Sequence, residues 1–408
     1  MKPVHDVPVD WEEVILGECV RLMKSGLSRL LSERDIGIPM LRSCNIGNRY
    51  PVFDNLKYWF VNDPQGANTS SYILKEGDLL VNFINSISQI GKACLYKNGI
   101  DRDCIYTTNI LRLVPRKKVH GEYLFLVTQT DRYNWYVSTI TKPAVNQASF
   151  TTKDLRKYLF PLPPLSEQKA IADLLSTWDE AIEKTERLIQ AKEKRFKRLM
   201  NDLIYVPTKE GKWNQIKNKS LFRERKSTKR DDLPLLSITN GEGVIPREDT
   251  NRKDTSNEDK SKYLRICPGD IGYNTMRMWQ GVSALSSLEG IVSPAYTICI
   301  PGEKLWPQFV AYLFKMPFMI HRFFRYSQGL TSDTWNLKFH HFSEVKMSLP
   351  SIEEQQQIAE TLNIAQQEID LLKQLVEKYK TQKRGLMQKM LTGEWRVKSE
   401  IVKQYEEA

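Results

Sequence analysis

The chain has 408 residues, of which 41% are hydrophobic, and its 60 Lys and Arg outnumber 49 Asp and Glu to give a net charge of +11. This length exceeds what one hydrophobic core usually fills, so we expect at least two core-forming domains. The positive charge favours a polyanionic partner, although ribosomal or membrane-surface binding fits it equally well.

The cysteines, the N-terminus and the lack of a long apolar stretch argue against four classes of protein: zinc-binding, disulfide-rich, secreted and membrane-spanning. The six cysteines are scattered, without a C-x-x-C pair or a nearby histidine pair, which argues against a zinc site and a disulfide framework. Acidic residues stand where a signal peptide needs an apolar core, and no apolar stretch approaches the length of a membrane span. We therefore expect a cytoplasmic protein without a bound metal.

The first region, residues 10 to about 160, predicts a mixed globular unit. Runs rich in β-forming residues, such as 78–84 and 122–127, are separated by turn signals, and we interpret both runs as strands. Consecutive prolines at 161–164 then force an extended chain and end this pattern. Ser166 and Glu167 open a helix directly afterwards, so a domain boundary is predicted here.

An internal repeat decides the architecture. The segment 162–172 returns as 349–359, at an offset of 187 residues, and the similarity continues without a gap for about forty positions. In each copy the apolar positions after the prolines step by four and three in alternation, which predicts a long helix with a heptad seam. The seam positions of the two copies are Ile171, Leu175, Trp178, Ile182, Thr185, Ile189, Lys192, Phe196, Leu199 and Leu203, and Ile358, Leu362, Ala365, Ile369, Leu372, Val376, Tyr379, Lys383, Leu386 and Met390.

Two helices with matching seams most simply bury them against each other. Each is about 60 Å long at 1.5 Å per residue, and pseudo-twofold packing of two domain-plus-helix halves makes the helices antiparallel. We therefore predict an α+β (mixed α/β) fold with two globular domains separated by an antiparallel coiled coil. The predicted segments are domain 1 at 1–160, helix 1 at 161–205, domain 2 at 206–348, helix 2 at 349–395 and a tail at 396–408.

The two globular regions also match each other loosely. Trp11 corresponds to Trp213, and the segments 39–41 and 76–79 correspond to 234–236 and 268–271. The basic stretch from 205 to 232 in the second region is interpreted as a linker followed by the first elements of the domain.

This organisation resembles the specificity subunit of bacterial type I restriction-modification systems. The resemblance covers nearly the whole chain and is carried by the paired Pro-x-x-x-Glu-Gln-x-x-Ile helix openings and by the terminal Leu-Met-Gln-x-x-Leu-Thr-Gly at 386–393. The segments 269–277 and 293–296 of the second region, and 77–82 and 108–110 of the first, are also similar to the family.

The resemblance implies a DNA-reading subunit with two target recognition domains, each reading one half of a split, asymmetric sequence. It implies helices that act as spacer and as docking surface for two methyltransferase subunits, which nuclease/translocase subunits join. Methylation on the amino group of adenine then uses S-adenosylmethionine held by the methyltransferase subunit, and ATP and Mg are expected on partner subunits, so no cofactor is expected here.

Catalytic motifs are missing from the sequence. It contains no P-loop, no amino-methylation motif of the Asn-Pro-Pro-Tyr type and no Gly-rich cofactor loop. Glu-x-Lys triplets such as 224–226 are expected by chance in a chain that is 27% charged. The adjacent His340 and His341 cannot face one metal from a regular helix or strand.

Candidate DNA contacts are amide, guanidinium, ammonium and hydroxyl groups in loops, because these groups pair with base edges and phosphates. In the second region they follow a strand-like run and recur before the second helix; the first region offers a similar pair of segments. For each, structural roles are the alternative: a salt bridge for Arg277, core packing for Trp279, and turn or capping chemistry for the loops. The predicted contacts are Asn82, Asn85, Ser86, Lys92, Lys142, Asn146, Gln147, Asn274, Arg277, Trp279, Gln280, Thr331 and Thr334.

Three functions remain after the sequence is read. The leading one is a non-catalytic DNA-specificity subunit. The second is a coiled-coil scaffold whose globular ends bind proteins, and the third is a self-contained nuclease or methyltransferase, which the missing motifs disfavour. Steep salt dependence of duplex binding distinguishes the first from the second.

Overall fold

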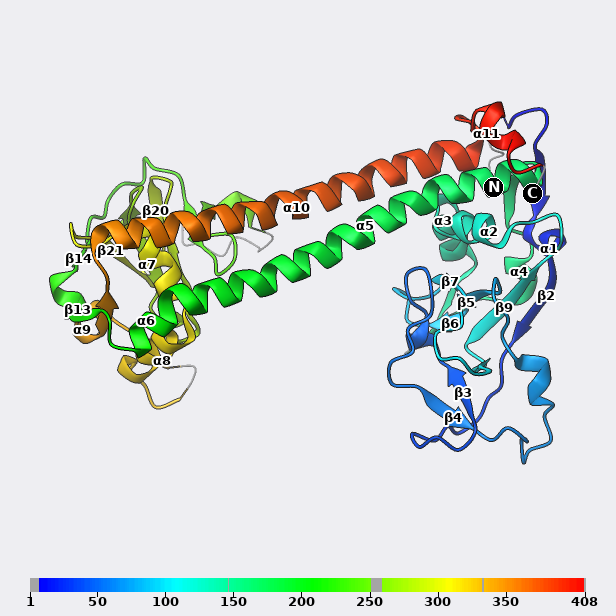
Figure 1. The fold of residues 1–408 in the computed structure, drawn as a ribbon, viewed down its shortest axis with the longest axis horizontal. Helices are drawn as coiled ribbons and strands as arrows, with labels where there is room; N and C mark the ends of the chain where they lie inside the picture. Colours follow the sequence, from blue (N-terminus) through cyan, green and yellow to red (C-terminus); the bar gives the residue numbers. More distant parts are fainter. Residues whose placement is uncertain (1–6, 146, 251–258, 332–333, 407–408) are drawn as a thin grey trace. The chain divides into compact units, whose positions relative to one another are not determined.

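The computed structural model describes residues 7–145, 147–250, 259–331 and 334–406. The chain divides into two compact units, one made of Met1–Lys184 with Val376–Ala408 and the other of Thr185–Leu375. Each unit, called unit 1 and unit 2 below, contains one globular part and one segment of each long helix (Figure 1). No helix among the described residues is long and apolar enough to cross a membrane.

The two long helices are α5, Leu165–Met200, and α10, Ile352–Thr392. Both begin directly after the proline-containing turns, since the ring fixes an extended chain before the first helical residue. A π-helical turn, Asn201–Tyr205, and the short α6, Val206–Lys209, continue α5. The predicted helix start at Ser166 is thus within one residue of the observed one.

Unit 1 is built on an antiparallel sheet in the order β2-β9-β5-β7, with α2 and α3 packed in its core. A second sheet, β4-β3-β8, and the pair β1-β12 complete it, and a small sheet, β10-β11-β6, joins two loops. The bounds are β1 Glu12–Ile15, α1 Leu16–Cys19, β2 Val20–Ser25, β3 Ile38–Leu41, β4 Lys57–Trp59, β5 Leu79–Asn82, β6 Ile84–Asn85, β7 Ala93–Leu95, β8 Ile105–Tyr106, β9 Ile110–Pro115, α2 Gly121–Thr128, α3 Asp131–Ile140, β10 Lys142–Pro143, β11 Ala148–Ser149, α4 Thr152–Leu155 and β12 Leu159–Leu162.

Unit 2 has the corresponding antiparallel sheet β14-β21-β18-β19, covered by α7, α8 and α9. The pairs β13-β22, β15-β16 and β17-β20 surround it. The bounds are β13 Asn214–Lys217, β14 Phe222–Glu224, β15 Leu236–Ile238, β16 Val244–Pro246, β17 Leu264–Ile266, β18 Ile271–Asn274, β19 Ser283–Leu285, β20 Gly290–Val292, β21 Tyr296–Pro301, α7 Pro307–Phe314, α8 Pro317–Tyr326, α9 Phe339–Glu344 and β22 Lys346–Leu349; a short α11, Ser399–Lys403, belongs to unit 1.

One predicted strand is wrong. The run 122–127, interpreted above as a strand, lies within helix α2. All five side chains from Tyr123 to Val127 are buried, so the segment shows neither the one-sided pattern of a surface helix nor the alternation of a strand. Periodicity cannot separate a buried helix from a buried strand in such a short apolar run.

The loose matches between the globular regions correspond to matching structure. Gly77 and Gly269 adopt positive φ angles of 82° and 88° at the same turn before β5 and β18. The aspartate that follows each glycine is buried and pairs with an arginine: Asp78 lies 2.7 Å from Arg112, and Asp270 lies 2.7 Å from Arg225. Each also accepts a hydrogen bond from a backbone N–H three residues earlier.

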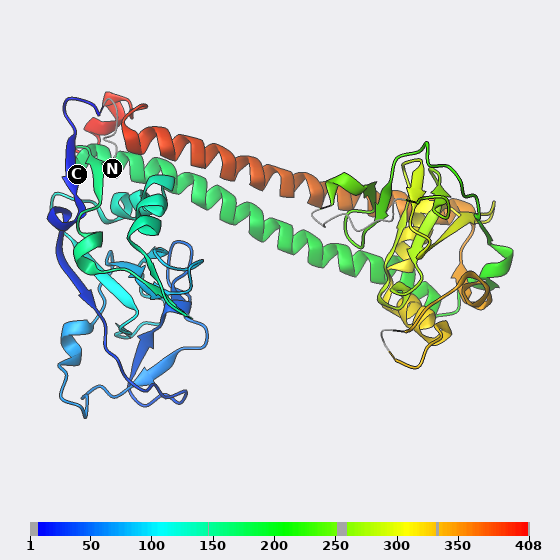
Figure 2. The same cartoon turned by 180° about the vertical axis from the view of Figure 1, so that it is seen from behind.

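The long helices lie side by side within each unit and run in opposite directions there (Figure 1, Figure 2). In unit 1, Trp178 packs edge-on against Tyr379, and Lys383 pairs with Asp179 at 2.5 Å. In unit 2, Lys192 pairs with Glu368 at 2.6 Å. Every predicted seam position is buried or half-buried, including the polar Thr185 and Lys192.

The repeated Glu-Gln pair fixes each globular part to its helix. In unit 1 the buried Gln168 accepts from the N–H of His120 at 2.8 Å and donates to the carbonyls of Lys118 and Pro163 at 3.0 and 2.8 Å. In unit 2, Gln355 repeats this pattern: it accepts from the N–H of Trp306 at 2.9 Å and donates to the carbonyls of Lys304 and Pro350, both at 3.1 Å.

The glutamate of each pair holds a tryptophan from the start of the globular part of the same unit. The indole N–H of Trp11 donates to Glu167 at 3.1 Å, and that of Trp213 donates to Glu354 at 3.3 Å. The Glu-Gln motif and the loosely matching tryptophans are therefore parts of one structural device in both units.

Candidate nucleic-acid interface

In unit 1, two of the loops predicted to contact DNA meet in the small sheet β10-β11-β6. Strand β6 in the loop after β5 pairs with β11, placing Asn85 opposite Ala148, and β11 pairs with β10, which begins at Lys142. Ser86 follows β6 and is exposed, and Asn85 accepts from the backbone N–H of Ser86 at 2.8 Å. Segments about sixty residues apart in the sequence thus form one surface.

The other predicted residues of unit 1 differ in exposure. Lys142 and Gln147 are exposed on the β10-β11 hairpin, whereas Lys92 is half-buried beside the end of β5. Asn82 is fully buried and donates to the carbonyl of Ser43 at 3.3 Å, so it supports the loop from beneath. Asn146 lies outside the residues that the structure describes.

In unit 2, the corresponding two loops also meet. The loop after β18 contacts the segment after α8 through a hydrogen bond from the N–H of Leu337 to the carbonyl of Thr275, at 2.7 Å. The rings of Trp279 and Trp335 pack edge-on with centroids 5.1 Å apart, and Trp335 also contacts Phe324 of α8. This aromatic cluster holds the two loops together.

Arg277 is exposed on the loop after β18. No carboxylate among the described residues lies within 4.0 Å of its guanidinium, so the structural salt bridge considered above does not occur in the described part of the chain. Asn274 is half-buried and Gln280 exposed on the same loop. Met278 is fully buried and anchors the loop in the core.

The segment after α8 carries the predicted threonines. Thr331 and Thr334 are both exposed, and the hydroxyl of Thr334 accepts from the N–H groups of Leu330 and Thr331, each at 3.1 Å. This turn chemistry shapes the loop and occupies the Thr334 oxygen as an acceptor, while its hydroxyl hydrogen is directed to the carbonyl of Thr331 at 2.9 Å.

A half-buried lysine that sequence reasoning missed positions the Arg277 loop. The ammonium of Lys315, at the end of α7, donates to the carbonyls of Gly281 and Ser283 at 2.8 and 2.7 Å and to the side-chain oxygen of Asn240 at 2.9 Å. Burial lowers the pKa of Lys315 to about 8. The sequence shows only a lysine after an apolar helix, where an exposed position is the usual expectation.

Comparison with known proteins agrees with this organisation. The sequence model of the type I restriction modification DNA specificity domain matches the chain twice, over residues 8–193 and 215–380. The chain belongs to this family. It is a specificity subunit of a type I restriction-modification system, and each match contains one globular part followed by repeat-helix sequence.

Two relatives from Methanocaldococcus jannaschii align along almost the whole chain. The "Putative type I restriction enzyme MjaX specificity subunit" is 26% identical, covering 97% of this chain and 96% of the relative. The "Type I restriction enzyme MjaVIII specificity subunit" is 24% identical, covering 96% and 95%. Among solved structures, the type I S subunit from M. genitalium has the same fold, with a TM-score of 0.56, 13% identity and coverage of 95% and 97%.

Proposed function

We propose that this specificity subunit reads a bipartite, asymmetric DNA target, with the globular part of each unit reading one half. The observation that carries the proposal is the convergence of two predicted loops in each unit. In unit 1 the loop after β5 meets the segment after α3, and in unit 2 the loop after β18 meets the segment after α8. β5 and β18 occupy the same place in the order of their sheets. Polar loops that a rigid scaffold holds in place are typical of recognition surfaces.

The residues proposed to contact DNA are the side chains predicted in these loops, which above Asn82 are exposed or half-buried wherever the structure describes them. A free guanidinium such as Arg277 suits bidentate pairing with guanine, whereas Lys142 suits a phosphate. Trp279 packs on Trp335, so it holds the neighbouring residues of its loop in place and also presents a ring edge for contact with DNA. The proposed contacts of unit 1 are Asn85, Ser86, Lys92, Lys142, Asn146 and Gln147, with Asn82 beneath them; those of unit 2 are Asn274, Arg277, Trp279, Gln280, Thr331 and Thr334.

The proposed role is non-catalytic. Two methyltransferase subunits that hold S-adenosylmethionine then methylate adenine, and nuclease/translocase subunits supply the ATP- and Mg-dependent restriction, in the cytoplasm. Exposed apolar side chains on the helix segments of unit 2 support docking of such partners, because large apolar groups on a helix surface mark interaction sites. Ile364 and Leu371 are 64% and 65% exposed, and Leu188 and Leu375 occupy equivalent repeat positions.

A further part of the proposal is that α5 and α10 form an antiparallel coiled coil that sets the unspecified gap between the half-sites. One helical turn is about 5.4 Å and one base pair about 3.4 Å. A one-turn insertion within 171–203, with a compensating turn in α10, is expected to lengthen the gap by one or two base pairs. An unchanged gap, read from the methylated genomic sites, contradicts this spacer role.

The deciding experiment is sequencing of modified adenines in genomic DNA from cells with and without this gene. The gene of the methyltransferase partner is present in both. Loss of one bipartite motif on deletion supports the proposal. Arg277→Gln is then expected to relax the half-site read by unit 2 and to leave the other half-site unchanged. Lys304→Gln removes an equivalent positive charge of unit 2 outside the converging loops and serves as the matched control.

The alternative function, a protein-binding scaffold, makes the opposite prediction in a simpler assay. Duplex binding through several phosphates weakens steeply between 50 and 200 mM salt, by about a thousandfold for six contacts. Absence of duplex binding by the complex at low salt, with intact assembly, favours the scaffold.

A further inference from the structure

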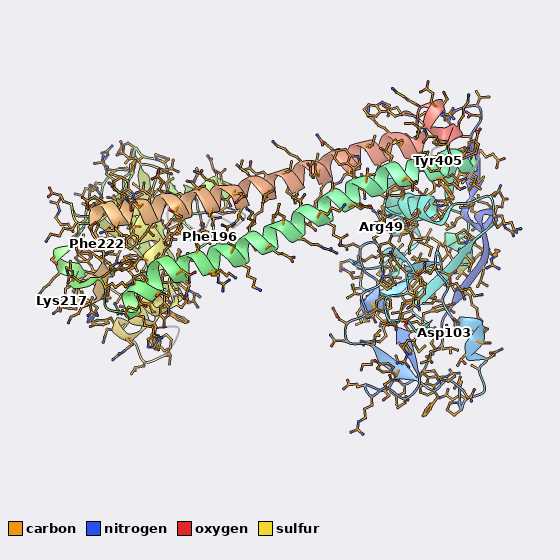
Figure 3. All side chains as sticks on the ribbon, viewed as in Figure 1. Arg49, Asp103, Phe196, Lys217, Phe222 and Tyr405 are labelled. Atoms are coloured by element: carbon orange, nitrogen blue, oxygen red, sulfur yellow. The ribbon has the colours of Figure 1, made fainter. Side chains whose placement is uncertain are left out.

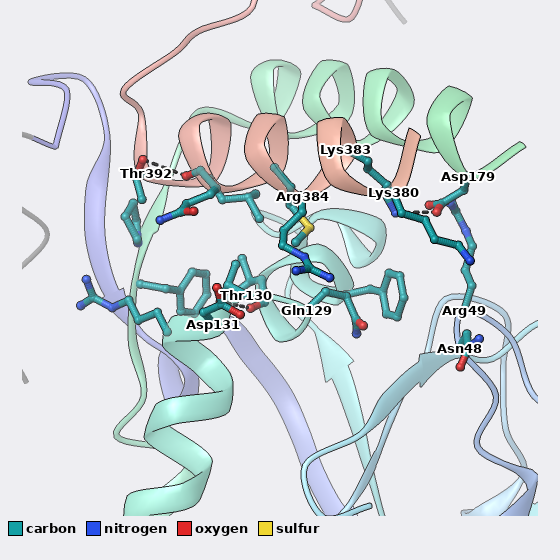
Figure 4. Close-up of a pocket in the computed structure, with 18 of the residues that line it drawn as sticks. Asn48, Arg49, Gln129, Thr130, Asp131, Asp179, Lys380, Lys383, Arg384 and Thr392 are labelled. Atoms are coloured by element: carbon teal, nitrogen blue, oxygen red, sulfur yellow. Dashed lines mark hydrogen bonds and ion pairs between the residues drawn. The ribbon is translucent and has the colours of Figure 1, made fainter. Parts of the chain in front are cut away.

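Unit 1 contains a cavity of about 390 Å³ between the end of α10 and the start of α3. This volume lies within the range of small-molecule sites. Its floor is apolar and includes three aromatic rings, and its rim is formed by charged side chains from α10, from α5, from the start of α3 and from the loop that carries Arg49 (Figure 4). The floor residues are Phe125, Val127, Tyr158, Phe160, Met387 and Leu391.

The rim carries an excess of positive charge, with five cations and two carboxylates. Asp179 is already used, because it pairs with Arg49 at 2.6 Å and with Lys383 at 2.5 Å. For Arg132 and Arg384, no carboxylate among the described residues lies within 4.0 Å. Figure 4 shows Arg384 reaching from α10 into the cavity.

Arg132 provides an independent observation. Its Nε and Nη2 atoms are buried and make no hydrogen bond with the described residues. Buried guanidinium nitrogens without partners are rare, because their desolvation is not compensated, and they call for an ion or ligand that completes them.

The repeat supplies an internal control for this cavity. In unit 2 the position equivalent to Arg132 is Phe318, and the positions equivalent to Lys383 and Thr392 are Phe196 and Tyr205. These aromatic side chains fill the space: Phe196 packs on Tyr312 with centroids 6.1 Å apart, and Tyr205 packs on Phe318 at 5.8 Å (Figure 3 labels Phe196). The same scaffold is therefore closed by aromatic rings in one unit and left open, with cations, in the other.

We propose that this cavity of unit 1 binds a small organic phosphate with a flat ring, of the size and chemistry of a nucleoside monophosphate. Guanidinium forks match phosphate oxygens, and the doubly charged phosphate suits the excess of positive charge better than a single carboxylate does. The ring packs on the aromatic floor, which a free inorganic anion leaves empty. This inference is independent of the proposed DNA contacts, because none of those residues lines the cavity.

The test uses the full-length chain and isothermal titration calorimetry with AMP as the probe. Adenosine lacks the phosphate, ribose 5-phosphate lacks the ring, and inorganic phosphate lacks both, so these three compounds separate the contributions. AMP is expected to bind at least tenfold more tightly than each of them. Arg384→Gln and Arg132→Gln are each expected to weaken AMP binding about tenfold, as loss of a charged hydrogen bond does.

Two matched variants sharpen the test. Lys197→Gln changes the exposed residue of α5 that is equivalent to Arg384, and is expected to leave AMP binding unchanged. The triple variant R132F/K383F/T392Y copies the filling of unit 2 and is expected to abolish AMP binding while the thermal transition stays cooperative.

Four results overturn the proposal. The first three are no AMP binding at 1 mM, equal weakening by Lys197→Gln and Arg384→Gln, and equal binding of adenosine and AMP. The fourth comes from titrations with duplex DNA. If Arg384→Gln weakens duplex binding as strongly as AMP binding, the cavity belongs to the DNA interface and the small-molecule proposal is wrong.

Discussion

Replacing Gln168 or Gln355 by methionine tests the device that joins each globular part to its helix. Methionine keeps the volume and flexibility of the side chain and removes its hydrogen-bonding groups. In unit 1 this leaves the N–H of His120 and the carbonyls of Lys118 and Pro163 without their partner. Each unsatisfied buried group costs about 1–3 kcal/mol, and a total of about 4 kcal/mol is expected because water reaches part of the loop.

The expected loss corresponds to a fall of about 10 °C in the Tm of the affected unit, since 1 kcal/mol shifts a unit of this size by about 2–4 °C. Calorimetry measures the thermal unfolding transition, and hydrogen exchange of peptides shows which unit the transition belongs to. Gln168→Met is expected to speed exchange in α2 and β12, and Gln355→Met in α7 and β22. A Tm change below 1 °C in both variants, with unchanged exchange of these elements, refutes the reasoning.

Two further predictions concern buried charges. Because burial lowers the pKa of Lys315 from 10.5 to about 8, the folded chain releases this proton first; the free energy of unfolding relative to Lys315→Met is therefore expected to rise between pH 8 and 10.5, measured by urea unfolding. Asp78→Asn leaves the guanidinium of Arg112, which is only 7% exposed, without its carboxylate, and is expected to lower the free energy of unfolding by about 3–5 kcal/mol. Asp270→Asn, beside the more exposed Arg225, is expected to lower it by less. Equal losses of unfolding free energy in the two variants contradict this ranking.

The sequence predicted the long helices well because their signals are local and repeated. The proline turn, the Glu-Gln opening and the alternating apolar positions each predict the same element, and α5 and α10 begin where these signals coincide. Helix α2 was missed because a fully buried run has no amphipathic period, so only packing decides between helix and strand there.

The sequence predicted the separate loops of the candidate interface, but it did not predict that these loops lie next to one another. Nothing local pairs β6 with β11 or brings Trp279 to Trp335, because both contacts depend on how distant strands and helices pack. The internal hydrogen bonds of the buried Asn82 and the half-buried Lys315 have the same origin. A polar residue type indicates hydrogen bonding but not whether the partner is DNA or the chain's own backbone.

The two units share the contacts that hold their loops in place, and they differ in the side chains that these loops carry. Gln168 and Gln355 make the same three bonds, and Asp78 and Asp270 brace the same turn before the strand that leads into a candidate DNA-binding loop. Because these bonds involve mainly backbone groups, they fix the loop positions without depending on loop sequence. The loops are therefore free to differ, with serine and lysine in one unit and arginine and tryptophan in the other, as the proposed reading of two unlike half-sites requires.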